Sequence, residues 1–250
     1  MPEGAQPGSA AAAGAGAGSP LLTVRGLNAW YGESHVLHGV DFDIAAGEVV
    51  TLLGRNGAGK TTTLKSIMGI VPRREGSIVF EGQETIRLGS NRIARLGIAY
   101  CPEERGIFAS LSCEENLKLP PQLTTGGMEI DEIYKLFPNL YERRNSPGTR
   151  LSGGEQQMLA VARILRTGAR LLLLDEISEG LAPVIVQTLA RTVRMLREKG
   201  YTIVMVEQNF RFAAPLADQF YVMEHGKIVE SFGAAELKAK MDMLHEYLGV

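Results

Sequence analysis

A glycine-rich segment carries the clearest chemical signal in the sequence. Residues 54–61 read Gly-Arg-Asn-Gly-Ala-Gly-Lys-Thr and match the pattern GxxxxGK[ST]. Glycines let the backbone N–H groups of such a loop turn toward phosphate oxygens, and a following helix adds the partial positive charge of its N-terminus. Lys60 is expected to reach the β- and γ-phosphates of a nucleotide, and the Thr61 hydroxyl to bind Mg²⁺. The predicted nucleotide-binding residues are Gly54, Arg55, Asn56, Gly57, Ala58, Gly59, Lys60, Thr61 and Thr62.

Two adjacent acids point to chemistry at the same phosphates. Asp175 and Glu176 directly follow the apolar run 171–174. A buried strand would deliver both acids to its carboxyl end, where ligands bind in parallel sheets. Asp175 is expected to hold Mg²⁺ through water, and Glu176 to polarise an attacking water. Two acids after a strand can also be solvated loop residues, but the phosphate loop favours the shared site.

The segments that must position these residues predict an α/β fold. Apolar runs of strand length are found at residues 48–53, 97–101, 171–174 and 202–206. Helices are expected at about 59–69 and from Pro183 onward, since proline is favoured at a helix start. Buried strands separated by helices form a parallel sheet.

Two further parts are expected around this core. Residues 21–31 and 35–44 alternate in the β manner and predict an antiparallel pair. The middle of the chain, about 105–165, is expected to form an inserted helical subdomain. Ser112 and Glu115 have the spacing of a capping box at the start of one of its helices.

Composition narrows the class of protein. Of 250 residues, 26 are Lys or Arg and 28 are Asp or Glu, so a net charge of −2 gives no support to a nucleic-acid coat. Only Cys101 and Cys113 could pair, so no disulfide framework is expected. The apolar runs are too short to predict a membrane span. Residues 1–20 are dominated by Ala, Gly, Ser and Pro and are expected to form a disordered tail.

A second motif identifies a family. Residues 151–156 read Leu-Ser-Gly-Gly-Glu-Gln, and with the phosphate loop and the acidic pair they make residues 21–250 resemble the ATP-binding subunits of ABC transporters. The resemblance implies a P-loop NTPase of ABC ATPase type, with an N-terminal antiparallel β element and an inserted α-helical subdomain. It also implies that two ATPs are held between head-to-tail subunits. The residues implied to bind the partner's nucleotide are Ser152, Gly153, Gly154 and Glu155.

The same resemblance assigns the nucleotide base to an aromatic residue. Tyr31 lies upstream of the phosphate loop, where the family stacks an aromatic side chain on adenine. Trp30 is the weaker candidate, because Tyr31 and Gly32 together fit the family pattern better. An ordinary surface aromatic on a strand is the alternative interpretation of Tyr31.

Several positions depart from the usual family residues. Glu103 stands where most members have Gln and would bring a third carboxylate near Mg²⁺ and the water. Gln208 replaces the usual switch histidine and would donate to a γ-phosphate oxygen without titrating. Ala182 lacks the carboxylate by which the usual Asp contacts the partner subunit, and Ile177 stands where Pro is usual.

With these departures the sequence resembles one subfamily, the smaller, F-type ATPase of the Liv branched-chain amino acid importers. The segments that carry this likeness lie at residues 99–108, 180–183, 206–209 and 247–249. The resemblance implies an ATPase, converting ATP and water to ADP and phosphate, that powers import of branched-chain amino acids. Urea or amide importers, lipid export, and a non-transport ABC ATPase acting on ribosomes or DNA remain as alternatives.

The implied partners follow from the same likeness. They are a second ABC ATPase subunit, with a heterodimer favoured and a homodimer open, and two transmembrane permease subunits. An extracytoplasmic substrate-binding protein would act indirectly, and no nucleic acid is expected. The expected location is peripheral, at the cytoplasmic face of the inner (plasma) membrane.

Overall fold

The computed structural model describes residues 19–248. Residues 1–18 and 249–250 lie outside the described part, so the predicted tail at 1–20 is covered only by its last two residues. Among residues 19–248, no helix has the length and apolar character needed to cross a bilayer.

A six-stranded sheet carries the acidic pair and the phosphate loop. Its spatial order is β10-β9-β3-β8-β7-β6. The five strands from β9 to β6 run parallel, and β10 pairs antiparallel with β9. The strands are β3 (Val49–Leu53), β6 (Ile98–Cys101), β7 (Leu171–Asp175), β8 (Thr202–Glu207), β9 (Gln219–Glu224) and β10 (Lys227–Gly233). The four parallel strands expected from the sequence are therefore confirmed, and β9 and β10 extend the sheet beyond them.

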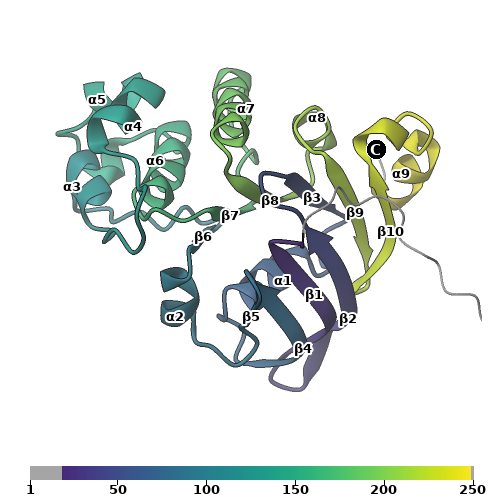
Figure 1. The fold of residues 1–250 in the computed structure, drawn as a ribbon. Helices are drawn as coiled ribbons and strands as arrows, with labels where there is room; N and C mark the ends of the chain where they lie inside the picture. Colours follow the sequence, from purple (N-terminus) through teal and green to yellow (C-terminus); the bar gives the residue numbers. More distant parts are fainter. Residues whose placement is uncertain (1–18, 249–250) are drawn as a thin grey trace, which may run out of the picture.

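A four-stranded antiparallel sheet lies beside the first, in the order β2-β1-β4-β5 (Figure 1). Its strands are β1 (Leu22–Tyr31), β2 (Ser34–Ile44), β4 (Arg73–Phe80) and β5 (Gln83–Glu84). The expected antiparallel pair is confirmed as β1 and β2. Strands β4 and β5 were not expected, because polar residues fill the first half of β4 and β5 is only two residues long.

Helices cover the parallel sheet, and most of those between β6 and β7 gather at one side of the molecule (Figure 1). The helices are α1 (Lys60–Ile67), α2 (Ser90–Arg95), α3 (Cys113–Lys118), α4 (Ile130–Leu136), α5 (Pro138–Glu142), α6 (Gly153–Leu165), α7 (Pro183–Glu198), α8 (Phe210–Ala213) and α9 (Met241–Leu248), with short 3₁₀ turns η1 (Gly148–Arg150) and η2 (Ala234–Glu236). Helices α3 to α6 make the inserted helical part predicted from the sequence.

Alternation along the buried strands explains how the layers hold together. Every residue of β3, β7 and β8 is buried. Successive side chains of a strand point to opposite faces, so Leu171 and Leu173 of β7 pack with α1 and the antiparallel sheet. Leu172 and Leu174 pack on the other face with α6 and α7. A parallel sheet covered on both faces needs such continuous apolar strands, and their carboxyl ends meet at one edge.

Candidate nucleotide site

The phosphate loop joins β3 to α1 and is shaped by its glycines. A Cβ at Gly54 would collide with the backbone carbonyl oxygen of Met223. Gly59 has φ +104, and a Cβ there would lie 2.8 Å from Leu37 Cδ2. Both positions therefore require glycine, which has no Cβ and adopts positive φ without strain. The turn they allow brings the N-terminus of α1 to the carboxyl edge of the sheet.

Lys60 is folded over this loop. Its side chain is only 4% exposed. The ammonium Nζ donates to the carbonyl oxygens of Gly54 at 2.9 Å and Arg55 at 3.2 Å, and it lies 3.5 Å from Glu176 Oε1. A buried ammonium needs such partners to offset its lost hydration. The charge is thus held inside the site, where a phosphate would meet it.

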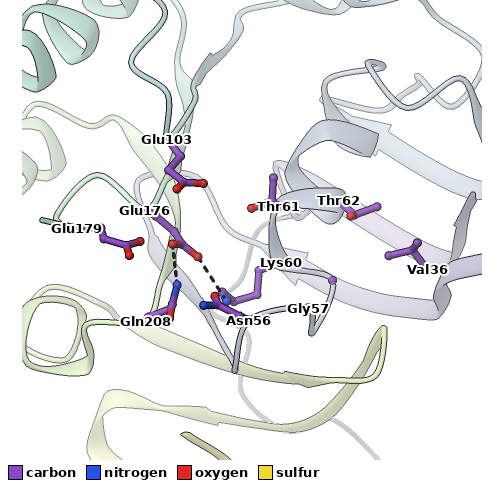
Figure 2. Close-up of a pocket in the computed structure, with 11 residues that line it drawn as sticks. Val36, Asn56, Gly57, Lys60, Thr61, Thr62, Glu103, Glu176, Glu179 and Gln208 are labelled. Carbon is purple, nitrogen blue, oxygen red and sulfur yellow. Dashed lines mark hydrogen bonds and ion pairs between the residues drawn. The ribbon is translucent and has the colours of Figure 1, made fainter. Parts of the chain in front are cut away.

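A cavity of about 370 Å³ opens beside Lys60 at the carboxyl edge of the parallel sheet (Figure 2). Residues of β2, the phosphate loop, the start of α1 and the segments that follow β6, β7 and β8 line it. They are Val36, Asn56, Gly57, Gly59, Lys60, Thr61, Thr62, Glu103, Glu176, Glu179 and Gln208. The cavity therefore joins most of the predicted phosphate-loop residues to the predicted catalytic residues.

Thr61 and Asp175 meet as the sequence predicts for a magnesium site. The Thr61 hydroxyl donates to Asp175 Oδ1 at 2.8 Å. The Tyr100 hydroxyl, from β6, donates to Asp175 Oδ2 at 2.7 Å. Burial raises the pKa of Asp175, and these two hydrogen bonds oppose that rise. A hydroxyl and a carboxylate side by side are the hard oxygen donors that Mg²⁺ prefers, so the residues present fit this ion.

Glu176 occupies an unusual backbone position. Its φ is +48, in the left-handed region that residues with a side chain seldom adopt. Its N–H donates to Val206 O at 2.9 Å, and its Oε2 accepts from Gln208 Nε2 at 2.8 Å. With Oε1 beside Lys60, the carboxyl is held from two sides and points into the cavity (Figure 2). This placement suits a group that must activate a water next to a phosphate.

Three carboxyls share one side of the cavity. One oxygen from each of Glu103, Glu176 and Glu179 lies within 4.8 Å of the others. The pKa of Glu179 is raised, first by a hydrogen bond with Glu176 and then by burial. The pKa of Glu103 is raised by burial and by the charge of Glu176. Since like charges at this distance resist full ionisation, the cluster favours retaining a proton. Glu103 thus lies beside Glu176, as the sequence predicts.

Other predicted residues lie outside the lining of this cavity. Tyr31 is at the end of β1 and is 45% exposed. Ser152 caps α6: its hydroxyl accepts from Glu155 N at 3.3 Å, and Glu155 Oε2 accepts from Ser152 N at 2.7 Å. These two hydrogen bonds form a capping box at the start of α6. Residues 152–155 are not among those that line the cavity of the same chain.

Four residues near the site were not anticipated from the sequence. Val36 and Glu179 line the cavity, Tyr100 holds Asp175, and Glu207 binds the loop after β7. Tyr100 lies on the expected strand 97–101, but its contact with Asp175 depends on the pairing of β6 with β7, which the sequence did not predict. Glu207 gave no signal, because it ends an otherwise apolar strand and resembles the first residue of a loop.

Comparisons with known proteins agree with this arrangement. Residues 37–179 match the family described as ABC transporter. The chain is 41% identical to the high-affinity branched-chain amino acid transport ATP-binding protein BraG of Pseudomonas aeruginosa, over 92% of this chain and 100% of that protein. It is 37% identical to the probable branched-chain amino acid transport ATP-binding protein LivF of Archaeoglobus fulgidus, over 87% of this chain and 93% of the relative. A solved structure described as the ATP binding subunit of an ABC transporter superposes with a TM-score of 0.77 at 27% identity, covering 92% of this chain and 100% of the other.

Proposed function

The chain belongs to the ABC transporter family of ATP-binding proteins, and on that premise we propose that it hydrolyses ATP to power import of branched-chain amino acids. The observation that carries the ATPase chemistry is the meeting of Lys60, Glu176 and Gln208 in one cavity at the mouth of the phosphate loop. The cargo is proposed from the two relatives named for branched-chain amino acid transport, which match this chain over most of its length.

The proposed reaction follows from the positions of the side chains. Backbone N–H groups of the loop bind the phosphates, and Lys60 neutralises charge on the β- and γ-oxygens. Glu176 accepts a proton from the attacking water. At the same time the oxygen of that water bonds to the γ-phosphorus, and the bond between the γ-phosphorus and ADP breaks. Gln208 keeps the Glu176 carboxyl in place. Thr61 and Asp175 would hold Mg²⁺, which would stabilise the negative charge of the phosphates when bound. Glu103 is proposed to place a third carboxylate near Mg²⁺ and the attacking water.

We propose a two-subunit ATPase, in which the start of α6 of one subunit completes the phosphate site of the other. The N-terminus of α6 presents the backbone N–H groups of Gly153 and Gly154 and the positive end of a 13-residue helix. Those residues do not line the cavity of their own chain, so they are available to the γ-phosphate held by a partner. A related ATPase is the favoured partner, and a second copy is the alternative.

The remaining assignments belong to the same proposal. Residues 21–250 form the ATP-binding domain, with residues of about 105–165 as its helical subdomain, and Tyr31 stacks on adenine. The ATPase works with two permease subunits and, through them, with an extracytoplasmic substrate-binding protein. It is peripheral, at the cytoplasmic face of the inner membrane, and binds no nucleic acid.

A pull-down tests the assembly. The tagged full chain is isolated from detergent-solubilised membranes of its host, and its partners are identified by mass spectrometry. Two polytopic membrane proteins and a second ATPase are expected, and ATP hydrolysis by that assembly should rise when a binding protein loaded with leucine is added. Ribosomal or DNA-repair partners without membrane proteins would refute the transport role, while stimulation by urea alone would refute only the cargo.

A further inference from the structure

A buried carboxyl at the end of β8 binds the loop that follows β7. Glu207 is 1% exposed and Ser178 is 3% exposed. The Ser178 hydroxyl donates to Glu207 Oε2 at 2.8 Å, and the Ser178 N–H donates to Glu207 Oε1 at 3.2 Å. Both oxygens of the carboxyl are therefore bound to a single residue of the neighbouring loop.

The residues on either side of Glu207 also bind the loop that follows β7. Gln208 follows Glu207 and donates to Glu176, two residues before Ser178. The carbonyl oxygen of Val206 accepts from the Glu176 N–H at 2.9 Å. Three consecutive residues of the β8 end thus hold the segment 176–178 by its backbone and by its side chains. The loop cannot shift without breaking several of these bonds together.

This grip explains how Glu176 keeps its backbone conformation. A residue with a side chain pays a steric cost at φ +48. Such conformations persist where the surrounding structure over-determines them, and they cluster at active sites. The hydrogen bonds from Glu207 to Ser178 fix the chain two residues after Glu176, while Val206 fixes Glu176 itself.

Stability alone gives no reason for a carboxyl at this position. Burial raises the pKa of Glu207 to about 8, which means that its ionised form is strongly disfavoured there. An apolar side chain of similar size at such a site is often neutral or stabilising. What an apolar side chain could not do is accept the Ser178 N–H and bind its hydroxyl.

We propose that Glu207 is a positioning residue for ATP hydrolysis, which through Ser178 fixes the loop that aims the Glu176 carboxyl at the attacking water. The inference rests on the proposed ATPase function and adds a residue to it. Glu207 does not line the nucleotide cavity, so it should affect turnover and leave ATP binding unchanged. A shift of about 1 Å in a reacting group can cost about 100-fold in rate.

Substitutions at Glu207 and Ser178 in the full chain test the proposal. We expect Glu207→Met to lower kcat about 10- to 100-fold and to leave KM for ATP unchanged. Ser178→Ala should lower kcat in the same direction, and the double variant should cost no more than Glu207→Met, because the two residues act through one contact. Glu207→Gln should restore turnover to within about twofold of the parent, since its amide can accept the N–H and donate to the hydroxyl.

A control variant separates positioning from loss of stability. Thr202 is buried at the other end of β8, where its hydroxyl accepts from the Gly47 N–H at 2.8 Å. Thr202→Val should lower the melting temperature and leave kcat unchanged. If Glu207→Met does not fold, kcat of Ser178→Ala and of Glu207→Gln decides whether Glu207 is a positioning residue.

The outcomes distinguish the two proposals. Parental kcat in Ser178→Ala and Glu207→Met, with an active parent, would overturn the positioning role and leave the ATPase function intact. A loss of kcat that Glu207→Gln fails to rescue would also overturn it. An assembled parent that binds ATP and does not hydrolyse it would instead contradict the proposed function.

Discussion

Glu207→Gln should change how the stability of this protein depends on pH. Burial raises the pKa of Glu207 from 4.5 to about 8 in the folded protein. The unfolded chain has no such burial, so its carboxyl titrates near 4.5. Between these values the folded protein holds a proton that the unfolded chain has released. The contribution of Glu207 to stability is therefore full below pH 4.5 and is lost as pH rises toward 8.

The size of the effect follows from the difference between the two pKa values. Each pH unit in this window removes about 1.4 kcal/mol of folding free energy. Between pH 6 and pH 7.5 the parent should lose about 2 kcal/mol through this residue. Gln cannot titrate and keeps its hydrogen bonds with Ser178, so the variant lacks this loss. The difference in unfolding free energy between variant and parent should grow by about 2 kcal/mol over the same window.

Urea unfolding at 25 °C, with both proteins measured in the same buffers from pH 5.5 to 9, would test this. Other carboxyls with raised pKa values, such as Asp175, are present in both proteins and cancel in the difference. The gap should widen up to about pH 8 and then stay constant. Two stability curves that run parallel from pH 6 to 8 would refute the argument, because Glu207 would then titrate alike in both states.

Two other substitutions test the chemistry at the cavity. Glu176→Gln removes the ion pair with Lys60 but can still accept the hydrogen bond from Gln208. The variant should bind ATP, lose about 100-fold or more in kcat, and accumulate as an ATP-bound dimer that size-exclusion chromatography detects. Parental turnover would show that Glu176 is not the base. Tyr100→Phe removes the 2.7 Å hydrogen bond to Asp175; the Mg²⁺ concentration for half-maximal ATPase activity should rise about 10-fold, and an unchanged value would exclude a role for Tyr100 in orienting the ligand.

The parallel core was predictable because each of its strands repeats one physical pattern. Residues 171–174 are four leucines followed by acids, and only a strand covered on both faces buries all of them. The antiparallel strands β4 and β5 were less visible, because β4 exposes much of its first half and β5 is only two residues long. Strand β4 pairs with β1, which lies more than forty residues earlier in the chain, and β5 pairs with β4.

The candidate site was predictable where residue type and chain position coincide. Lys60 and Thr61 belong to one loop, and the hydrogen bond between Thr61 and Asp175 follows from placing that loop and β7 at one sheet edge. Glu207 could not be identified in this way. Its role depends on a contact with Ser178, 29 residues away, and no spacing in the sequence reveals that contact.

The charge at the cavity gives a physical reason for a closed, two-subunit site. The carboxyls of Glu103, Glu176 and Glu179 line it, together with the positively charged side chain of Lys60. A nucleoside triphosphate would bring further negative charge to a wall that already carries these acids. In the proposed assembly two charges would compensate: Mg²⁺ at Thr61 and Asp175, and the positive helix end at residues 152–155 of a second subunit. Because that helix end lies outside the cavity of its own chain, the proposed two-subunit arrangement would let a partner complete the compensation of the γ-phosphate. Hydrolysis followed by release of this phosphate would remove its charge from the interface, weaken the closed dimer and allow it to open.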